Sequence, residues 1–164
     1  MPMQNLATLR PAYIKDLPIL VSLLQDAKEQ MRSENVTQWD DHYPNIAILN
    51  KDIENHSLYL LGPDNIAAIS ITQKGKDWHL HRLMVHSSVK GQGIAKRILL
   101  NIIQNGYHNS VDNIWISTNH SNLPMIHILN SLGFCFSHKT KLFGREKYGY
   151  FFIYTYNLKR KMLR

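Results

Sequence analysis

Apolar and polar residues follow helix-like and strand-like spacings in a regular order along the chain. From residue 19 to residue 31, apolar residues recur at intervals of three and four, which is typical of an amphipathic helix. Asp16 and Pro18 suit the first turn of that helix. The first half is therefore predicted to hold a strand over 7–12, a helix through 19–31, a loop over 33–45, a helix over 46–54 and strands over 57–62 and 66–72.

The second half alternates more strictly between strands and helices. The same patterns predict strands over 78–85, 113–118, 134–141 and 148–158, helices over 93–107 and 124–132, and a frayed basic tail over 159–164. This order predicts an α/β fold, a single domain over 1–164 with one mixed central sheet of about seven strands and about four helices. Ligands favour the carboxyl ends of strands in such crossover units, so a site is expected where the strand over 78–85 ends.

Composition and charge narrow the function classes. The formal net charge is +7, which favours acidic ligands such as nucleotides, phosphates or nucleic acid, although it also serves plain solubility. The lysines and arginines are scattered between residues 10 and 164 and no nucleic-acid-binding motif is visible, so we expect no nucleic-acid partner. The single cysteine, Cys135, excludes an internal disulfide and a multi-cysteine zinc site, and we expect it to be a small buried side chain.

Membrane and export signals are not visible in the sequence. No apolar stretch approaches the roughly 20 residues of a membrane span, and the amino-terminal residues lack the apolar core of a signal peptide. We therefore expect a cytoplasmic protein without membrane contact.

A glycine-rich turn is the strongest local signal for chemistry. Gly91 and Gly93 stand one residue apart at the start of a predicted helix, where the first amides have no internal partner and carry the positive end of the helix dipole. Such a turn suits an anion. A Walker loop is excluded because Gln92 and Ile94 follow the glycines, and a dinucleotide fingerprint is weak because Lys96 replaces its third small residue.

The remaining pattern is carried by the stretch "HRLMVHSSVKGQGIAKRIL". It resembles the pyrophosphate-binding motif of the GNAT acyl-coenzyme A N-acetyltransferases, with Lys90 in place of the usual glutamine or arginine. The stretch "NHSNLPMIHILNSLGF" is similar to the second signature of that family, and "TQWDDHYP" with the following helix and strand looks like its amino-terminal region. The resemblance covers nearly the whole chain.

The resemblance implies a cofactor cleft between splayed central strands, with acetyl-CoA as co-substrate and a primary amine of a small molecule or peptide as acceptor. It also implies that the backbone of Leu83, Met84 and Val85 pairs with the pantetheine arm. The pyrophosphate is expected on Lys90, Gly91, Gln92, Gly93, Ile94, Ala95 and Lys96. Asn122 matches a cofactor-contacting asparagine, although it also suits the N-cap of the next helix. Homodimers are common in the family. The alternative to a transferase is a coenzyme A-binding sensor with little catalytic activity.

Catalysis of acetyl transfer requires removal of a proton from the amine, which at pH 7 costs roughly 4–5 kcal/mol for a pKa of about 10.4. The tyrosine and glutamate that the family frequently uses are replaced by Leu129 and Ser117. His81 and then His79 are the candidate bases, because both lie on one face of a strand and imidazole accepts a proton at neutral pH. They could equally line the cleft or pack against aromatic residues. The backbone N–H of Val85 is the candidate donor to the developing oxyanion.

The loop over 33–45 matches the region where the family binds its acceptor. Trp39, Asp40 and Tyr43 could therefore contact a cationic amine, or they could be aromatic anchors in a solvated loop. No metal is expected, because the His79-x-His81 pair lacks a third placed ligand.

Overall fold

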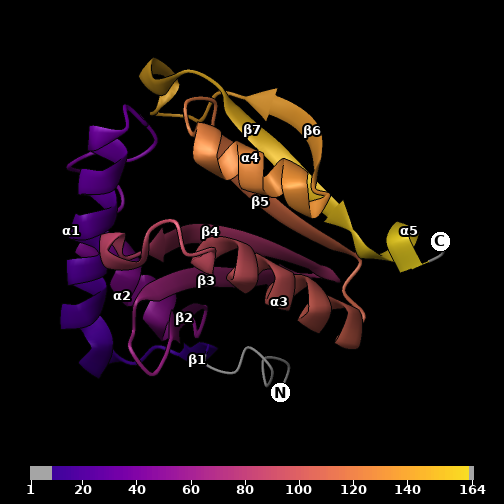
Figure 1. Ribbon diagram of the computed structural model, residues 1–164, viewed down its shortest axis with the longest axis horizontal. Helices are drawn as coiled ribbons and strands as arrows, with labels where there is room; N and C mark the ends of the chain where they lie inside the picture. Colours follow the sequence, from indigo (N-terminus) through magenta and orange to yellow (C-terminus); the bar gives the residue numbers. More distant parts are fainter. Residues whose placement is uncertain (1–8, 163–164) are drawn as a thin grey trace.

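The structure is a computed structural model that describes residues 9–162, and it contains one seven-stranded sheet in the order β1-β2-β3-β4-β5-β7-β6. All neighbouring strands are antiparallel except β4 and β5, which are parallel. The strands are β1 Leu9–Pro11, β2 Leu58–Leu61, β3 Ala67–Lys74, β4 Asp77–Val85, β5 Asn113–Asn119, β6 Cys135–Thr140 and β7 Phe151–Asn157. The predicted α/β class and mixed seven-stranded sheet are confirmed (Figure 1).

Five α-helices flank the sheet: α1 Leu17–Ser33, α2 Ile46–Glu54, α3 Ile94–His108, α4 Leu123–Leu132 and α5 Leu158–Met162. Three short 3-10 segments cover Ile14–Asp16, Ser87–Val89 and Glu146–Tyr148. In Figure 1, α3 and α4 cover the near face of the sheet, and α1 stands on the left of the view, beside the end of β4. Within the described residues, no helix is long and apolar enough to cross a membrane.

The two faces of the sheet bury separate apolar cores. On the face covered by α3, the strand residues Leu80 and Ile114 pack with Ile98 of that helix. On the other face, Leu60 and Met84 pack with residues of α1 and α2. This two-sided burial explains why β2 and most of β3 are buried at successive positions, whereas the paired parts of β4 and β5 alternate between buried and partly exposed residues.

A β-bulge near the end of β4 changes which side chains face which core. Ala68 pairs with Met84 but Ser70 pairs with His81, so β4 carries one extra residue relative to β3. Arg82 lies at the bulge with a φ of 53°, and its guanidinium binds Asp52 of α2 with an Nη2–Oδ2 distance of 2.6 Å. An extra residue shifts the alternation by one position, so Met84 faces the α1–α2 core and its neighbours in sequence face the other way.

The central strands β4 and β5 separate after only four paired positions. Their parallel ladder runs from Asp77 and Asn113 to Leu80 and Ile116, and the remaining residues of both strands are not paired with one another. This opening confirms the splayed strands that the family resemblance implied.

Polar side chains from α1 and the loop after it bridge the opening. Gln30 donates from Nε2 to the carbonyl of Val85 on β4 at 2.9 Å. On the β5 side, the Oε1 of Gln38 accepts from Thr118 Oγ1 at 2.9 Å and from the Asn119 N–H at 3.0 Å. The segment between these two glutamines therefore lies across the end of the sheet and binds polar groups on both separated strands.

One expectation about the carboxyl end needs correction. Residues 159–162 do not fray, because they belong to the short helix α5, whose first residue Leu158 is only 1% exposed. Lys161 of this helix donates to the carbonyl of Gly133 at 3.0 Å. Residues 163–164, and residues 7–8 of the first predicted strand, lie outside the described part of the chain.

We predict that Leu158→Ala lowers the free energy of unfolding by about 2–4 kcal/mol, because it removes a fully buried side chain beside α3. Urea unfolding followed by circular dichroism measures the change. Lys159→Ala, on the exposed side of the same helix, is the control and should change stability by less than about 0.5 kcal/mol. Equal stability of the Leu158→Ala variant and the wild type would show that α5 does not contribute to the core.

Candidate functional site

A cavity of about 480 Å³ lies beside the end of β4, where this strand has separated from β5. Its walls come from α1, the end of β4, the turn that follows, the start of α3 and the first part of α4. Among the residues proposed from the sequence to hold a cofactor, it brings together Leu83, Met84, Val85, Lys90, Gly91, Gly93, Ile94, Ala95, Lys96 and Asn122. Gln92 is absent from this lining, and its N–H donates to the carbonyl of Val89 at 3.3 Å.

The glycines of the turn are required by their backbone conformation. Gly91 and Gly93 have φ values of 78° and 74°, which side-chain-bearing residues rarely adopt. A Cβ built on either glycine would have no neighbouring atom within 4 Å, so the space beside the turn is open. The first helical bond of α3 runs from the Arg97 N–H to the Gly93 carbonyl at 3.0 Å. The N–H groups of residues 94–96 therefore have no acceptor within the helix and can bind an anion.

The backbone of Val85 faces the opening rather than β3. The next residue, His86, donates its N–H to the carbonyl of Ile66 at 2.8 Å, on the β3 side. Because successive residues of a strand direct their polar groups to alternate sides, the N–H and carbonyl of Val85 point toward β5. The carbonyl already accepts from Gln30 Nε2, but the strand that should pair with the Val85 N–H has turned away, so this edge can receive an extended ligand through that N–H.

No pattern in the sequence indicated the contacts between α1 and the residues that lead into the glycine turn. Lys90 forms an ion pair with Glu34, at the end of α1. Asp26 accepts from the N–H and Oγ of Ser87, at 2.8 and 2.6 Å, and from Gln30 Nε2 at 2.7 Å. Burial alone would raise the pKa of Asp26, but these hydrogen bonds outweigh it and hold the pKa below its ordinary value. The helix therefore fixes the turn through a charged carboxylate.

Asn122 caps α4 and also lines the cavity. Its Oδ1 accepts from the Met125 N–H at 3.4 Å, and its Nδ2 lies 3.4 Å from Gln38 Oε1. The capping function is thus present, while contact with a cofactor stays a prediction.

The two candidate histidines lie beside the point where the strands separate. His81 and Ser117 are the first residues beyond the last β4–β5 pair. His79, His81 and Ser117 line a second cavity of about 340 Å³, together with Trp115. The rings of His81 and His79 are 11° from parallel, with their centroids 6.5 Å apart. The rings of His79 and Trp115 are 14° from parallel, with their centroids 6.3 Å apart.

Both imidazoles are poorly able to hold a proton. Burial lowers the pKa of His81 to about 4, and the positive charge of Arg82 adds to the effect. Burial also lowers the pKa of His79, with a further contribution from Lys74. Both rings are therefore neutral at pH 7, and the Nε2 of His81 lies 3.1 Å from Thr72 Oγ1. A neutral ring can accept a proton, but a pKa of about 4 makes His81 a weak base.

The predicted acceptor-binding residues of the α1–α2 loop are engaged inside the protein. Trp39 is 8% exposed and packs in the α1–α2 core, as expected for an aromatic anchor. Asp40 accepts from the N–H of His42 and of Tyr43, at 2.9 and 2.8 Å, and from the hydroxyl of Tyr148. Contact of Asp40 and Tyr43 with an acceptor stays a prediction.

Arg145 is the centre of this loop cluster, and no feature of the sequence pointed to it. Its guanidinium lies 4.6 Å from the ring centroids of both Tyr43 and Tyr148, and it donates to the carbonyl of Gln38 at 2.9 Å. It also lies 3.4 Å from the carboxylate of Asp40. The β6–β7 connection is thereby fixed to the α1–α2 loop over the end of β5.

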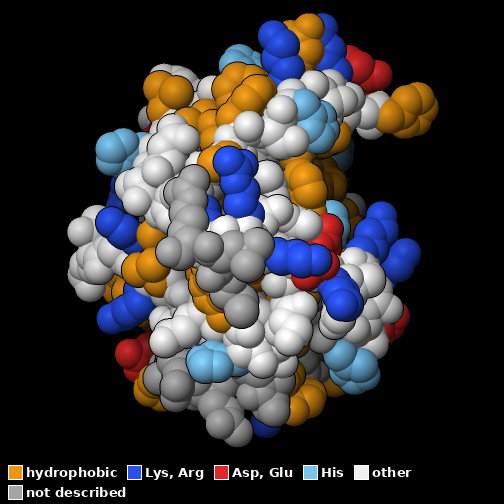
Figure 2. Space-filling model, turned by 90° about the vertical axis from the view of Figure 1, so that its right-hand side faces the viewer, with side chains coloured by type: hydrophobic (Ala, Val, Ile, Leu, Met, Phe, Trp, Pro, Cys, Tyr) orange, Lys and Arg blue, Asp and Glu red, His pale blue; other side chains and the backbone are white. Residues whose placement is uncertain are grey.

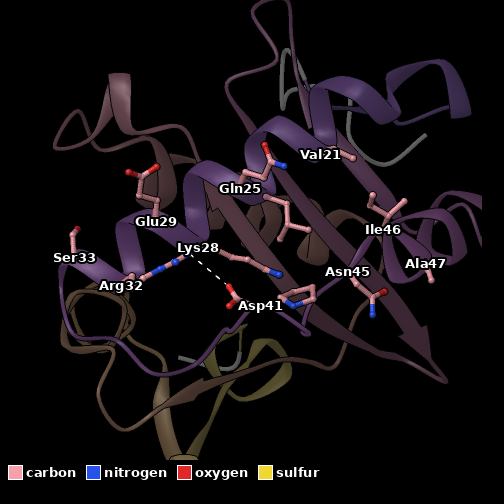
Figure 3. Close-up of a pocket in the computed structure, with 12 residues that line it drawn as sticks. Val21, Gln25, Lys28, Glu29, Arg32, Ser33, Asp41, Asn45, Ile46 and Ala47 are labelled. Carbon is pink, nitrogen blue, oxygen red and sulfur yellow. Dashed lines mark ion pairs between the residues drawn. The ribbon is translucent and has the colours of Figure 1, made fainter.

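A larger groove of about 1020 Å³ lies on the opposite side of α1 (Figure 3). Arg32 and Asp41 face each other across it at 4.0 Å, but their side chains are 69% and 83% exposed, so the pair contributes little. Lys28 also points into this groove. Because α1 separates the groove from the opening between β4 and β5, we assign it no part in the site.

Other candidate groups have plain structural positions. Cys135 is exposed on β6, which corrects the expectation of a buried thiol, because this strand forms the edge of the sheet. Leu129 is fully buried in the core. No group of three or more metal-ligating side chains occurs within residues 9–162. Figure 2 shows the lysines and arginines of one face dispersed among other side chains.

A model of the acetyltransferase (GNAT) family matches residues 20–134 of the chain. The chain matches none of the curated proteins by sequence. Its fold is similar to that of a GNAT-family acetyltransferase from Streptococcus agalactiae, with a TM-score of 0.77, 20% identity, and coverage of 91% of this chain and 94% of that one.

Two further solved structures share the fold. The ribosomal-protein-S18-alanine N-acetyltransferase of Escherichia coli has a TM-score of 0.71 and 16% identity, and the match covers 92% of this chain and 93% of that one. The PaiA N-acetyltransferase of Thermoplasma acidophilum, solved in complex with coenzyme A, has a TM-score of 0.74 and 14% identity, and the match covers 91% of this chain and 97% of that one.

We predict that Asp40→Asn lowers the free energy of unfolding by about 1–2 kcal/mol at pH 7. Burial alone would raise the pKa of Asp40, but hydrogen bonds led by that from Tyr148, together with the charge of Arg145, lower it from 3.8 to about 2. The folded pKa is depressed, so the stabilisation is present above pH 4 or so and is lost as the pH falls toward 2.

Urea unfolding of both proteins between pH 7 and pH 2 measures this effect. The difference between the wild type and the Asp40→Asn variant should shrink over the acidic range. Asp41→Asn is the control, because that side chain is 83% exposed. A difference that stays constant with pH would contradict the assignment of the stabilisation to the Asp40 charge.

Proposed function

The chain belongs to the GNAT acetyltransferase family and is an acyltransferase, and we propose that it transfers an acetyl group from acetyl-CoA to a primary amine by direct attack. The observation that carries this proposal is the cavity beside the separated strands, which combines a glycine turn at the start of a helix with a strand edge that has no ladder partner. A small molecule or a peptide supplies the amine.

The residues of the cavity fit coenzyme A. A diphosphate requires donors without partners and room to approach them, and residues 91–96 offer a helix start beside open space. Lys90 and Lys96 line the same region and add positive charge. The outward-facing backbone of Val85 suits the amide groups of the pantetheine arm. When bound, acetyl-CoA supplies an acetyl group activated as a thioester.

The chain itself has to stabilise charge and move a proton. The N–H of Val85 faces the opening and is the proposed donor to the negative charge that develops on the carbonyl oxygen. His81, at the point where the strands separate, is the proposed proton acceptor, and His79 is the second choice. Asn122 is the proposed contact from α4. The cofactor and the acceptor would thus meet across the gap between β4 and β5.

A coenzyme A-binding sensor is the second candidate. It is favoured by Leu129, which is fully buried at the position where the family frequently has a tyrosine acid. Release of free thiol from acetyl-CoA in the presence of an amine library distinguishes the two. Amine-dependent release supports the transferase, whereas tight binding of coenzyme A without release supports the sensor.

We predict that Gly93→Ala weakens coenzyme A binding by at least about tenfold, because a side chain strains the turn and fills the space beside its amides. Calorimetric titration with coenzyme A measures the affinity. Gly75→Ala is the matched control: Gly75 also has a positive φ, 59°, and also has no atom near a built Cβ, but it lies in the β3–β4 turn. Both variants should lose similar stability, so an equal loss of affinity in both would contradict the proposed diphosphate site.

We predict that Glu34→Gln tightens coenzyme A binding by about 3- to 10-fold at low ionic strength. The carboxylate of Glu34 competes with the diphosphate for Lys90, and its removal also lessens repulsion of a polyanion. Glu29→Gln removes an equal charge from the exposed face of the same helix and serves as the control. If Glu34→Gln binds coenzyme A no better than Glu29→Gln, Glu34 is not a competitor.

A further inference from the structure

The second cavity, beside His81, has an unusual lining for a site that takes an amine. It is lined by His79, Leu80, His81, Trp115, Ile116, Ser117, His138 and Ile153, and none of them is a carboxylate. The rings of His81, His79 and Trp115 form a row with nearly parallel planes along the cavity. Resting on the proposed function, we propose that this cavity holds the acceptor, and that the acceptor is an amine carried on a planar, uncharged group rather than a polyamine.

The carboxylates closest to the ring series are already bound. Asp77 accepts from Trp115 Nε1 at 2.9 Å and from Asn113 Nδ2 at 3.1 Å. Asp52 accepts from Arg82 Nε at 3.0 Å and from its Nη2. Asp77 keeps its negative charge because both of its donors are neutral, but it does not line the cavity. A polyamine needs several carboxylates to offset the loss of its hydration, and the lining contains none.

Burial of the rings also disfavours a cationic ligand. Burial is the main cause of the lowered pKa of both imidazoles, while the charges near them oppose one another: Lys74 and Arg82 lower the pKa of His79 and His81 respectively, and Asp77 and Asp52 raise it. The same loss of hydration acts against an ammonium group placed beside the rings. A planar uncharged group instead gains apolar contact with Trp115 and Ile153.

The proton balance favours the same class of acceptor. Transfer of a proton from an amine of pKa about 10.4 to His81, with a pKa of about 4, is unfavourable by roughly 10⁶-fold. An amine attached directly to an aromatic ring is neutral at pH 7 and loses its proton only as the new N–C bond forms and the thiolate leaves. In that step the nitrogen gains the acetyl group, sulfur takes the C–S electron pair, and His81 takes the proton.

The test compares three amines as acceptors with acetyl-CoA: aniline, 2-phenylethylamine and spermidine. We expect kcat/KM, measured by thiol release, to be at least about tenfold higher for aniline, which is neutral at pH 7, than for 2-phenylethylamine and spermidine, which are both ammonium ions at that pH. Calorimetric titration of aniline into the protein saturated with coenzyme A should show binding, and titration of spermidine should not. Equal or greater turnover of spermidine would overturn the proposal.

Variants of Trp115 make the test specific. Trp115→Leu should lower kcat/KM for aniline at least about tenfold and abolish its calorimetric signal, with coenzyme A affinity unchanged, while Trp115→Phe should retain the preference. Phe136→Leu is the control, because Phe136 is 52% exposed and packs beside Tyr154, away from this cavity. An unchanged preference in Trp115→Leu would overturn the proposal. If the wild type fails to bind coenzyme A, the proposed function itself is wrong.

Discussion

The separation of β4 from β5 is the constraint on which the rest of the structure depends. Two parallel strands that stop pairing after Leu80 and Ile116 leave backbone donors and acceptors without a ladder partner in the middle of a sheet. Unpaired polar groups in a protein interior are costly, so the opening persists only where other groups bind them. Gln30 and Gln38 bind the two sides of the opening, and the edge that remains unbound is available to a ligand.

The β-bulge at Arg82 makes that opening useful. Without the extra residue, Met84 would turn toward α3 and Val85 would turn its polar groups toward β3. The bulge costs backbone strain at a positive φ, and the ion pair of Arg82 with Asp52 offsets part of that cost. Strain and charge pairing thus set the register of the strand edge that faces the cavity.

Charge around the site is balanced internally before any ligand arrives. Lys90 is paired with Glu34, Arg145 lies beside Asp40, and Asp26 is bound by Ser87 and Gln30. These pairs connect α1 and the loops to the turn and to β5. On the proposed function, the diphosphate of the cofactor would therefore displace the Glu34 carboxylate from Lys90.

The sequence by itself determined most of the elements, their order and the position of the glycine turn. These depend on neighbouring residues: apolar spacing defines α1 and α3, and the positive φ of Gly91 and Gly93 favours glycine whatever surrounds it. The family resemblance added the splayed strands. Only the tertiary structure decided the burial of Trp39, the contacts of Arg145, the helix at 158–162 and the lowered pKa of His81. Each of these arises from packing between segments far apart in the chain, as between Arg145 and Gln38, and no local pattern specifies such a contact.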